Sequence, residues 1–72
     1  MSRHQICEHA IVRLRRPVGN WQLGTEGTVV AAKGASKLVE IADEQGNMLD
    51  LVTVIDGDLD LVWSPAEHSR SA

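Results

Sequence analysis

Apolar side chains recur at every second position in several short runs of this chain, and this period constrains the fold more than any other feature. Successive side chains of a β-strand point to opposite faces of the sheet, so such a run buries one face and leaves the other in water. In 37–42, Val39 and Ile41 alternate with Glu40, and 59–63 begins with two leucines separated by an aspartate. The pattern predicts an all-β fold.

Five short strands are expected, with turn residues between them. They span 9–15, 27–33, 37–42, 48–54 and 59–63. Gly34, Gly46 and Asn47 lie between these runs and tolerate the backbone angles of tight turns. The second, third and fourth strands are predicted to form an antiparallel meander, and 56–58 is predicted to form a single 3₁₀ turn.

The remaining segments are predicted to be a loop and two ends. A long ordered loop is expected over 16–26, which contains a proline and two glycines and shows no sustained period. Its Trp21 and Leu23 are expected to fold back over one mouth of a barrel formed by 9–63. Residues 1–8 are predicted to be an N-terminal tail, and 64–72 has the Ser-Pro-x-Glu start of a short helical turn or tail.

The chain has 72 residues and therefore room for one domain with a thin core. That core must consist of Val, Leu, Ile and Ala, because the sequence has no Phe or Tyr and only two tryptophans, Trp21 and Trp63. Domains of this size are usually reinforced by disulfides, metals or self-association, and a lone cysteine, Cys7, excludes an internal disulfide. We therefore expect a homo-oligomer. The lone cysteine and the absence of a signal-peptide pattern or membrane span favour the cytoplasm.

Several motifs occur in a recognisable order. They are Gly24, the Gly-Thr-Val-Val run 27–30, the acidic turn 43–47, and the run 51–54 followed by a turn and Leu59. In this order the chain resembles the SH3-like barrels of the KOW type, and more closely a family of small uncharacterised bacterial proteins with the same barrel, over about 9–62. The resemblance implies a five-stranded SH3-like barrel, and it implies no activity or catalytic motif.

A possible metal site lies near the N-terminus. If this segment is extended, the side chains of Cys7 and His9 point to one side of the strand, as two zinc ligands should. A structural zinc site needs four ligands in recognised spacings, and the sequence does not supply them. We expect a solvated tail here, with neither a metal nor another cofactor.

Three arginines and a nearby tryptophan suggest a nucleic-acid surface. Arg13, Arg15 and Arg16 supply cations and Trp21 a stacking ring, and barrels of this general shape are often used in this way. The formal net charge of −3 and the isoelectric point of about 5.4 disfavour it, because nucleic-acid binders normally show a basic excess. The alternative is that alternating arginines keep a strand edge soluble.

The charges are distributed unevenly along the chain. The segment up to Lys37 has a formal charge of +4, and the segment from Leu38 onward has −7. Either the two segments interleave and pair their charges within the fold, or a segregated pattern remains and favours docking to another copy or to a basic partner. An antitoxin or immunity-like protein that binds a basic partner is the corresponding functional hypothesis.

No catalytic constellation is recognisable. The three histidines lie near the ends of the chain, and no nucleophile motif or phosphate loop is present. A pore-type active site shared by an oligomer, as in the plasmid-borne drug-resistant dihydrofolate reductases, needs a Gln and a Tyr that 52–55 lacks.

The sequence therefore predicts a non-enzymatic interaction module that self-associates and binds a protein or a small ligand. No membrane partner is expected. Trp21, Trp63 and Leu23 are the candidate interface or ligand-contact residues, because large rings dominate contact energies. For the two tryptophans, ordinary packing within the barrel is an equally good interpretation.

Overall fold

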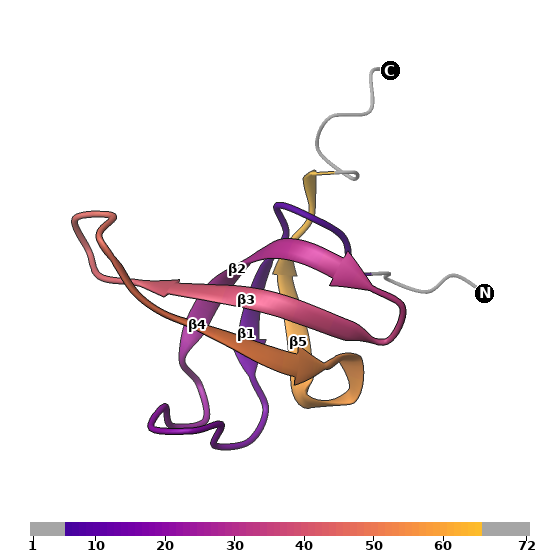
Figure 1. The fold of residues 1–72 in the computed structure, drawn as a ribbon, viewed down its shortest axis with the longest axis horizontal. Helices are drawn as coiled ribbons and strands as arrows, with labels where there is room; N and C mark the ends of the chain where they lie inside the picture. Colours follow the sequence, from indigo (N-terminus) through magenta and orange to yellow (C-terminus); the bar gives the residue numbers. More distant parts are fainter. Residues whose placement is uncertain (1–5, 66–72) are drawn as a thin grey trace.

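The computed structural model describes residues 6–65, and all structural statements below apply to that part of the chain. It contains one antiparallel sheet with the strand order β4-β3-β2-β1-β5 (Figure 1). The elements are β1 (Ile11–Leu14), β2 (Glu26–Lys33), β3 (Ser36–Ala42), β4 (Met48–Ile55), the 3₁₀ turn η1 (Asp56–Asp58) and β5 (Leu59–Trp63). The prediction of an all-β fold with five strands is confirmed, and the sheet is open.

The element bounds agree with the alternation except at the two ends. The turn η1 and β5 have the predicted limits, and β2, β3 and β4 are each one residue longer. The predicted first strand, 9–15, was too long: His9 has a φ of 73°, and the Ala10 N–H donates to the Cys7 carbonyl in a turn. The predicted helical turn falls mostly on 66–72, outside the described residues.

The core lies where the curled sheet brings its two ends together. In Figure 1, β1 and β5 run across β3 and β4. Buried side chains from all five strands form one cluster. Its members are Ala10, Val12, Leu14, Val29, Val39, Ile41, Val54 and Leu59. The predicted core of small aliphatic residues is confirmed. Trp21 only packs against this cluster from outside, and Trp63 is exposed.

Gly27 marks the closest approach of β2 to its neighbours. It is buried opposite Val12 of β1. A Cβ added to it would lie 2.6 Å from Val39 Cγ1 and 2.8 Å from the Glu40 carbonyl oxygen of β3. These distances are too short for any side chain, so only glycine fits between these strands.

The segment between β1 and β2 is an ordered loop, as predicted. Its base is closed by two backbone bonds, from the Leu14 N–H to the Thr25 carbonyl (2.9 Å) and from the Gly24 N–H to the Leu14 carbonyl (2.8 Å). Its tip is a tight turn in which Val18 and Trp21 exchange two bonds of 2.9 Å. Trp21 is half-buried against the core, but the Leu23 side chain is 65% exposed, so the expectation that Leu23 covers the core was wrong.

The turn between β3 and β4 is organised by one carboxylate. Asp43 Oδ1 accepts the backbone N–H groups of Gln45 and Asn47, both at 2.9 Å, and Asp43 Oδ2 accepts the Asn47 amide at 3.3 Å. Gly46 has a φ of +88°. The pKa of Asp43 is lowered below its ordinary value, mainly by the hydrogen bond from the Asn47 backbone N–H. The donors around this carboxylate stabilise its charged form.

The lowered pKa of Asp43 predicts a pH dependence of this turn. A carboxyl group whose pKa is lower in the folded state contributes stability that is complete above its unfolded pKa and is lost as the pH falls through its folded pKa. Asp43→Asn is expected to remove this acid-dependent part of the unfolding free energy. A carboxyl-detected NMR titration measures the Asp43 pKa directly, and a value at or above the ordinary aspartate range would contradict the prediction.

Candidate functional site

The edge strand β4 carries four of the eight large hydrophobic residues that are exposed in the described chain. Met48, Leu49, Leu51 and Ile55 have side chains that are 43–55% exposed. Val54, by contrast, belongs to the buried core. Because side chains alternate along a strand, Leu51 and Ile55 share the outer face of the sheet. Leu49 is the extra residue of a β-bulge, since Ile41 lies opposite Asp50 and Ala42 opposite Met48.

The outer face continues from β4 onto β3 and β2. In the register of the sheet, Leu51 lies opposite Glu40, and Thr53 lies opposite Leu38, which in turn pairs with Ala31. We call Leu38, Leu51, Thr53 and Ile55 the outer patch. Within β4, the only charged residue is Asp50, and the strand contains neither lysine nor proline. Two residue types that commonly protect an edge strand from pairing are therefore absent from β4, although Asp50 and the β-bulge at Leu49 interrupt its first half.

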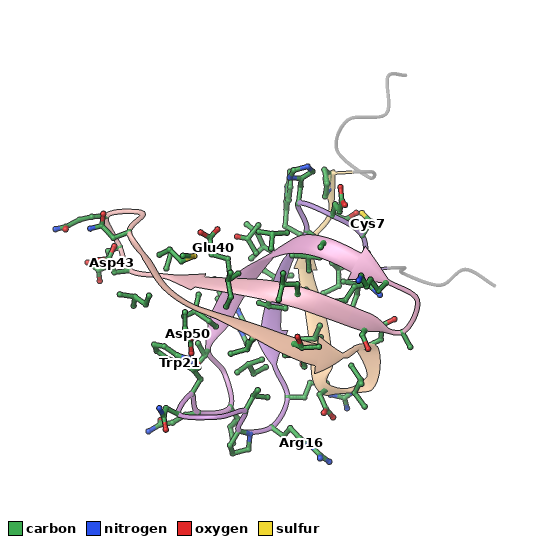
Figure 2. The ribbon with its side chains drawn as sticks, viewed as in Figure 1. Cys7, Arg16, Trp21, Glu40, Asp43 and Asp50 are labelled. Carbon is green, nitrogen blue, oxygen red and sulfur yellow. The ribbon has the colours of Figure 1, made fainter. Side chains whose placement is uncertain are left out.

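Asp50 connects this edge to the loop between β1 and β2. Its Oδ2 accepts a hydrogen bond from Trp21 Nε1 at 2.8 Å, and its Oδ1 accepts the N–H of Leu51 at 2.9 Å. Figure 2 shows Trp21 and Asp50 next to each other where the loop meets β4. Trp21, a predicted contact residue, therefore holds the loop against the edge strand, and its ring is partly occupied by core packing.

Removing the indole N–H is expected to loosen this connection. Trp21→Phe keeps an aromatic ring but loses the bond to Asp50, and we expect a loss of about 1 kcal/mol in unfolding free energy because the carboxylate is exposed and regains water. Urea unfolding of Trp21→Phe, Asp50→Asn and the double variant gives the coupling between them. Strictly additive effects would show that the bond contributes nothing.

The three predicted nucleic-acid arginines lie on the surface, each beside a carboxylate. Arg13 Nη2 is 2.7 Å from Glu26 Oε2, Arg15 Nε is 3.6 Å from Asp60 Oδ1, and Arg16 Nε is 3.2 Å from Asp58 Oδ1. None of these ion pairs involves Trp21, whose indole N–H donates to Asp50. Their charge is locally balanced, which weakens a surface for phosphate groups.

Ion pairs also connect the basic and acidic segments of the chain. Arg15 pairs with Asp60 of β5, and Arg16 pairs with Asp58 of η1. A third pair joins Lys37 Nζ to Asp56 Oδ1 at 2.7 Å. In the described part of the chain, these pairs favour interleaving of the two segments over segregation.

A hollow of about 710 Å³ lies between the N-terminal segment, the β2–β3 turn and β5. Cys7, Glu8, Lys37, Asp56 and Asp60 contribute to its lining. The Lys37 side chain is only 4% exposed, and its Nζ also donates to the Gly34 carbonyl at 2.7 Å. Lys37 was not among the predicted site residues, although it shares the parity of Val39 and Ile41 and therefore lies on the buried face.

The predicted metal ligands do not act together. Cys7 is half-buried, with Sγ 4.0 Å from Ser64 Oγ, whereas His9 is exposed in the turn before β1. The extended conformation that would align them is therefore absent. Among the described residues, no group of three or more histidine, cysteine or carboxylate side chains is arranged to hold a metal ion.

The other predicted contact residues are accessible. Trp63 is 37% exposed at the end of β5, where it lies opposite Ile11, and Leu23 is exposed in the β1–β2 loop. They lie on different elements from the outer patch, and no pocket of the described chain is lined by Trp21, Leu23 and Trp63 together. The edge strand was not among the predicted contact surfaces, because 48–55 has apolar residues at both parities and this concealed its exposed face.

Comparisons with known proteins add no family. A scan against family models and searches of curated proteins and of solved structures found no match to this chain. In addition, no helix among residues 6–65 has the length and apolar character needed to cross a membrane.

Proposed function

We propose that this protein is a non-enzymatic interaction module with an SH3-like strand arrangement, which self-associates through β4 and the outer patch. The observation that carries the proposal is an edge strand of eight residues with exposed Met48, Leu49, Leu51 and Ile55. The curled sheet and the 3₁₀ turn between its last two strands support the SH3-like arrangement.

An open strand edge is a binding surface because its backbone groups are not paired on one side. Each such N–H and C=O can bond to an added strand, and side chains on the exposed face then provide selectivity. The other edge, β5, has five residues and includes Asp60, whose carboxylate is paired with Arg15. The longer and almost uncharged β4 is the better surface for strand addition.

The other functional hypotheses have less support. A KOW-like role in nucleic-acid binding rests on arginines that lie beside carboxylates, as described above. An antitoxin or immunity-like role rests on the acidic segment, three of whose carboxylates (Asp56, Asp58, Asp60) are paired with cations of the same chain. The hollow beside Lys37 is the candidate site for a small ligand. The Lys37 ammonium, however, already donates to the Gly34 carbonyl and to the Asp56 carboxylate.

Sedimentation velocity tests the proposal with a matched pair of variants. Leu51→Lys puts a positive charge on β4 opposite Glu40, whose carboxylate can pair with the new ammonium group. Leu23→Lys makes the same change on the exposed loop. We expect the parent chain to show concentration-dependent association at tens of micromolar, Leu51→Lys to weaken it at least tenfold, and Leu23→Lys to leave it unchanged.

The controls separate two ways in which the proposal can fail. Circular dichroism confirms that both variants keep the β fold of the parent chain. A parent chain that is monomeric up to several hundred micromolar would overturn self-association. Association that responds equally to both variants would retain an oligomer but exclude β4 as its interface.

A further inference from the structure

Two opposite charges on the outer face of the sheet have no ion-pair partner among residues 6–65. They are Lys33, at the end of β2, and Glu40, in the middle of β3. The other four lysines and arginines of this part of the chain each pair with a carboxylate. Lys33 is exposed, whereas Glu40 is half-buried, so a cation beside it interacts more strongly than one beside a fully exposed carboxylate.

The register of the sheet places both charges on the same face as the outer patch. Along β3, Ser36, Leu38 and Glu40 share this face, because the residues between them are buried on the other side. Residues that are paired across neighbouring strands also share a face. Three rows across the sheet follow: Lys33 with Ser36 and Ile55, Ala31 with Leu38 and Thr53, and Thr28 with Glu40 and Leu51. The bulge residues of β2 and β4 lie outside these rows.

Each of the two charges lines a shallow groove. A groove of about 160 Å³ is lined by Lys33 together with Ala31 and Leu38, and one of about 190 Å³ is lined by Glu40 together with Thr28. Within one chain the two charged rows are four residues apart along β3, which is about 13 Å. The two charges are therefore too far apart to pair with each other, and only another molecule can supply their partners.

From this layout we infer that the outer faces of two copies stack against each other about a two-fold axis at Leu38, with their β3 strands antiparallel. The inference rests on the proposed self-association and specifies its contact. In this arrangement Lys33 of each copy lies beside Glu40 of the other, and Ile55 of each copy lies over Leu51 of the other. The contact uses the face of the sheet and requires no pairing between strand edges.

The arrangement of charges favours a second copy in this orientation. A two-fold contact requires a surface that is complementary to itself, and an apolar centre with opposite charges at its two ends meets this requirement when one copy is reversed. Stacked sheets lie about 10 Å apart, a gap that a lysine and a glutamate facing each other span. Stacking with the β3 strands parallel would set Glu40 against Glu40, and like charges in contact are unfavourable.

Charge reversal in two separate variants tests the stacking. Lys33→Glu brings carboxylates together at both ends of the contact, and Glu40→Lys brings ammonium groups together. We therefore expect each variant alone to dimerise at least tenfold more weakly than the parent chain in sedimentation velocity. An equimolar mixture is expected to regain dimerisation to within threefold of the parent chain, because the heterodimer has opposite charges at both ends.

A matched control makes the same charge change away from the outer face. Glu44→Lys lies in the exposed β3–β4 turn and is expected to dimerise like the parent chain. Circular dichroism checks that all variants keep the β fold. A mixture that associates no better than Lys33→Glu and Glu40→Lys alone would overturn the stacking but retain self-association. A parent chain that stays monomeric would overturn the proposed function as well.

A second measurement uses the parent chain and so does not depend on the folding of any variant. A carbodiimide couples a lysine amine directly to a carboxylate as an amide, with no spacer between them. In a mixture of isotope-labelled and unlabelled chains, we expect the covalent dimer to contain a peptide that joins Lys33 of one copy to Glu40 of the other. A dimer coupled mainly through Glu44, or one without this peptide, would overturn the inferred contact.

Discussion

Replacing Gly27 with alanine is expected to destabilise the fold by about 3 kcal/mol, the upper end of the range for overpacking a close-packed interior. The new Cβ would meet the Glu40 carbonyl oxygen at 2.8 Å and Val39 Cγ1 at 2.6 Å. The carbonyl belongs to the backbone of β3 and cannot rotate away as a flexible side chain can. The two strands must therefore separate, which also disturbs the core contact of Val39.

Gly57→Ala is the matched control for this substitution. Gly57 lies in η1, has no heavy atom within 4 Å of the position of an added Cβ, and does not have a positive φ. Its replacement is expected to change the unfolding free energy by less than ~1 kcal/mol, with a gain possible from reduced freedom of the unfolded chain. Equal effects of the two substitutions in urea unfolding would show that the approach of β2 to β3 is not limiting.

Removing the carboxylate of Asp56 is expected to cost about 2–3 kcal/mol, because it leaves the buried ammonium of Lys37 with the Gly34 carbonyl as its remaining partner in the described structure. The expected loss is smaller than for a fully buried pair because Asp56 is 42% exposed, so water can partly replace it. Lys37→Met removes the charge and keeps an unbranched side chain, and we expect it to change stability by less than ~1 kcal/mol.

The decisive comparison is the cost of Asp56→Ala in the parent chain against its cost in the Lys37→Met background. In the Lys37→Met background, Asp56→Ala is expected to cost less than ~0.5 kcal/mol, since no buried charge remains to be compensated. Urea unfolding at neutral pH measures all three variants against the parent chain. An equal cost of Asp56→Ala in both backgrounds would assign the effect to the η1 backbone and not to the ion pair.

The sequence predicted the strands because their alternation is local. In 37–42 and 59–63 the alternation of apolar and polar residues indicates which face is buried. The turn η1 and the strand β5 have the limits that this pattern predicted. The run that forms β4 is apolar at both parities, so the alternation could not show that Val54 is buried while Leu49 and Leu51 are exposed. That choice depends on which face the curled sheet covers, which is a property of the whole fold.

The candidate site was less predictable because its contacts join distant parts of the chain. Trp21 and Asp50 are separated by 29 positions, and nothing near either residue indicates that they meet. The pairing of Arg16 with Asp58 and of Arg15 with Asp60 likewise depends on β1 and β5 being neighbours in the sheet. Lys37 is the exception, because its parity with Val39 and Ile41 gave a usable signal.

The adjacency of β1 and β5 also determines where the described chain enters and leaves the fold. Cys7 and Ser64 lie within 4.0 Å through their side-chain atoms, although 57 positions separate them. A short peptide joining these two points would close the chain into a ring with little rearrangement. The fold is thus suited to circular permutation, in which β1 and β5 become consecutive.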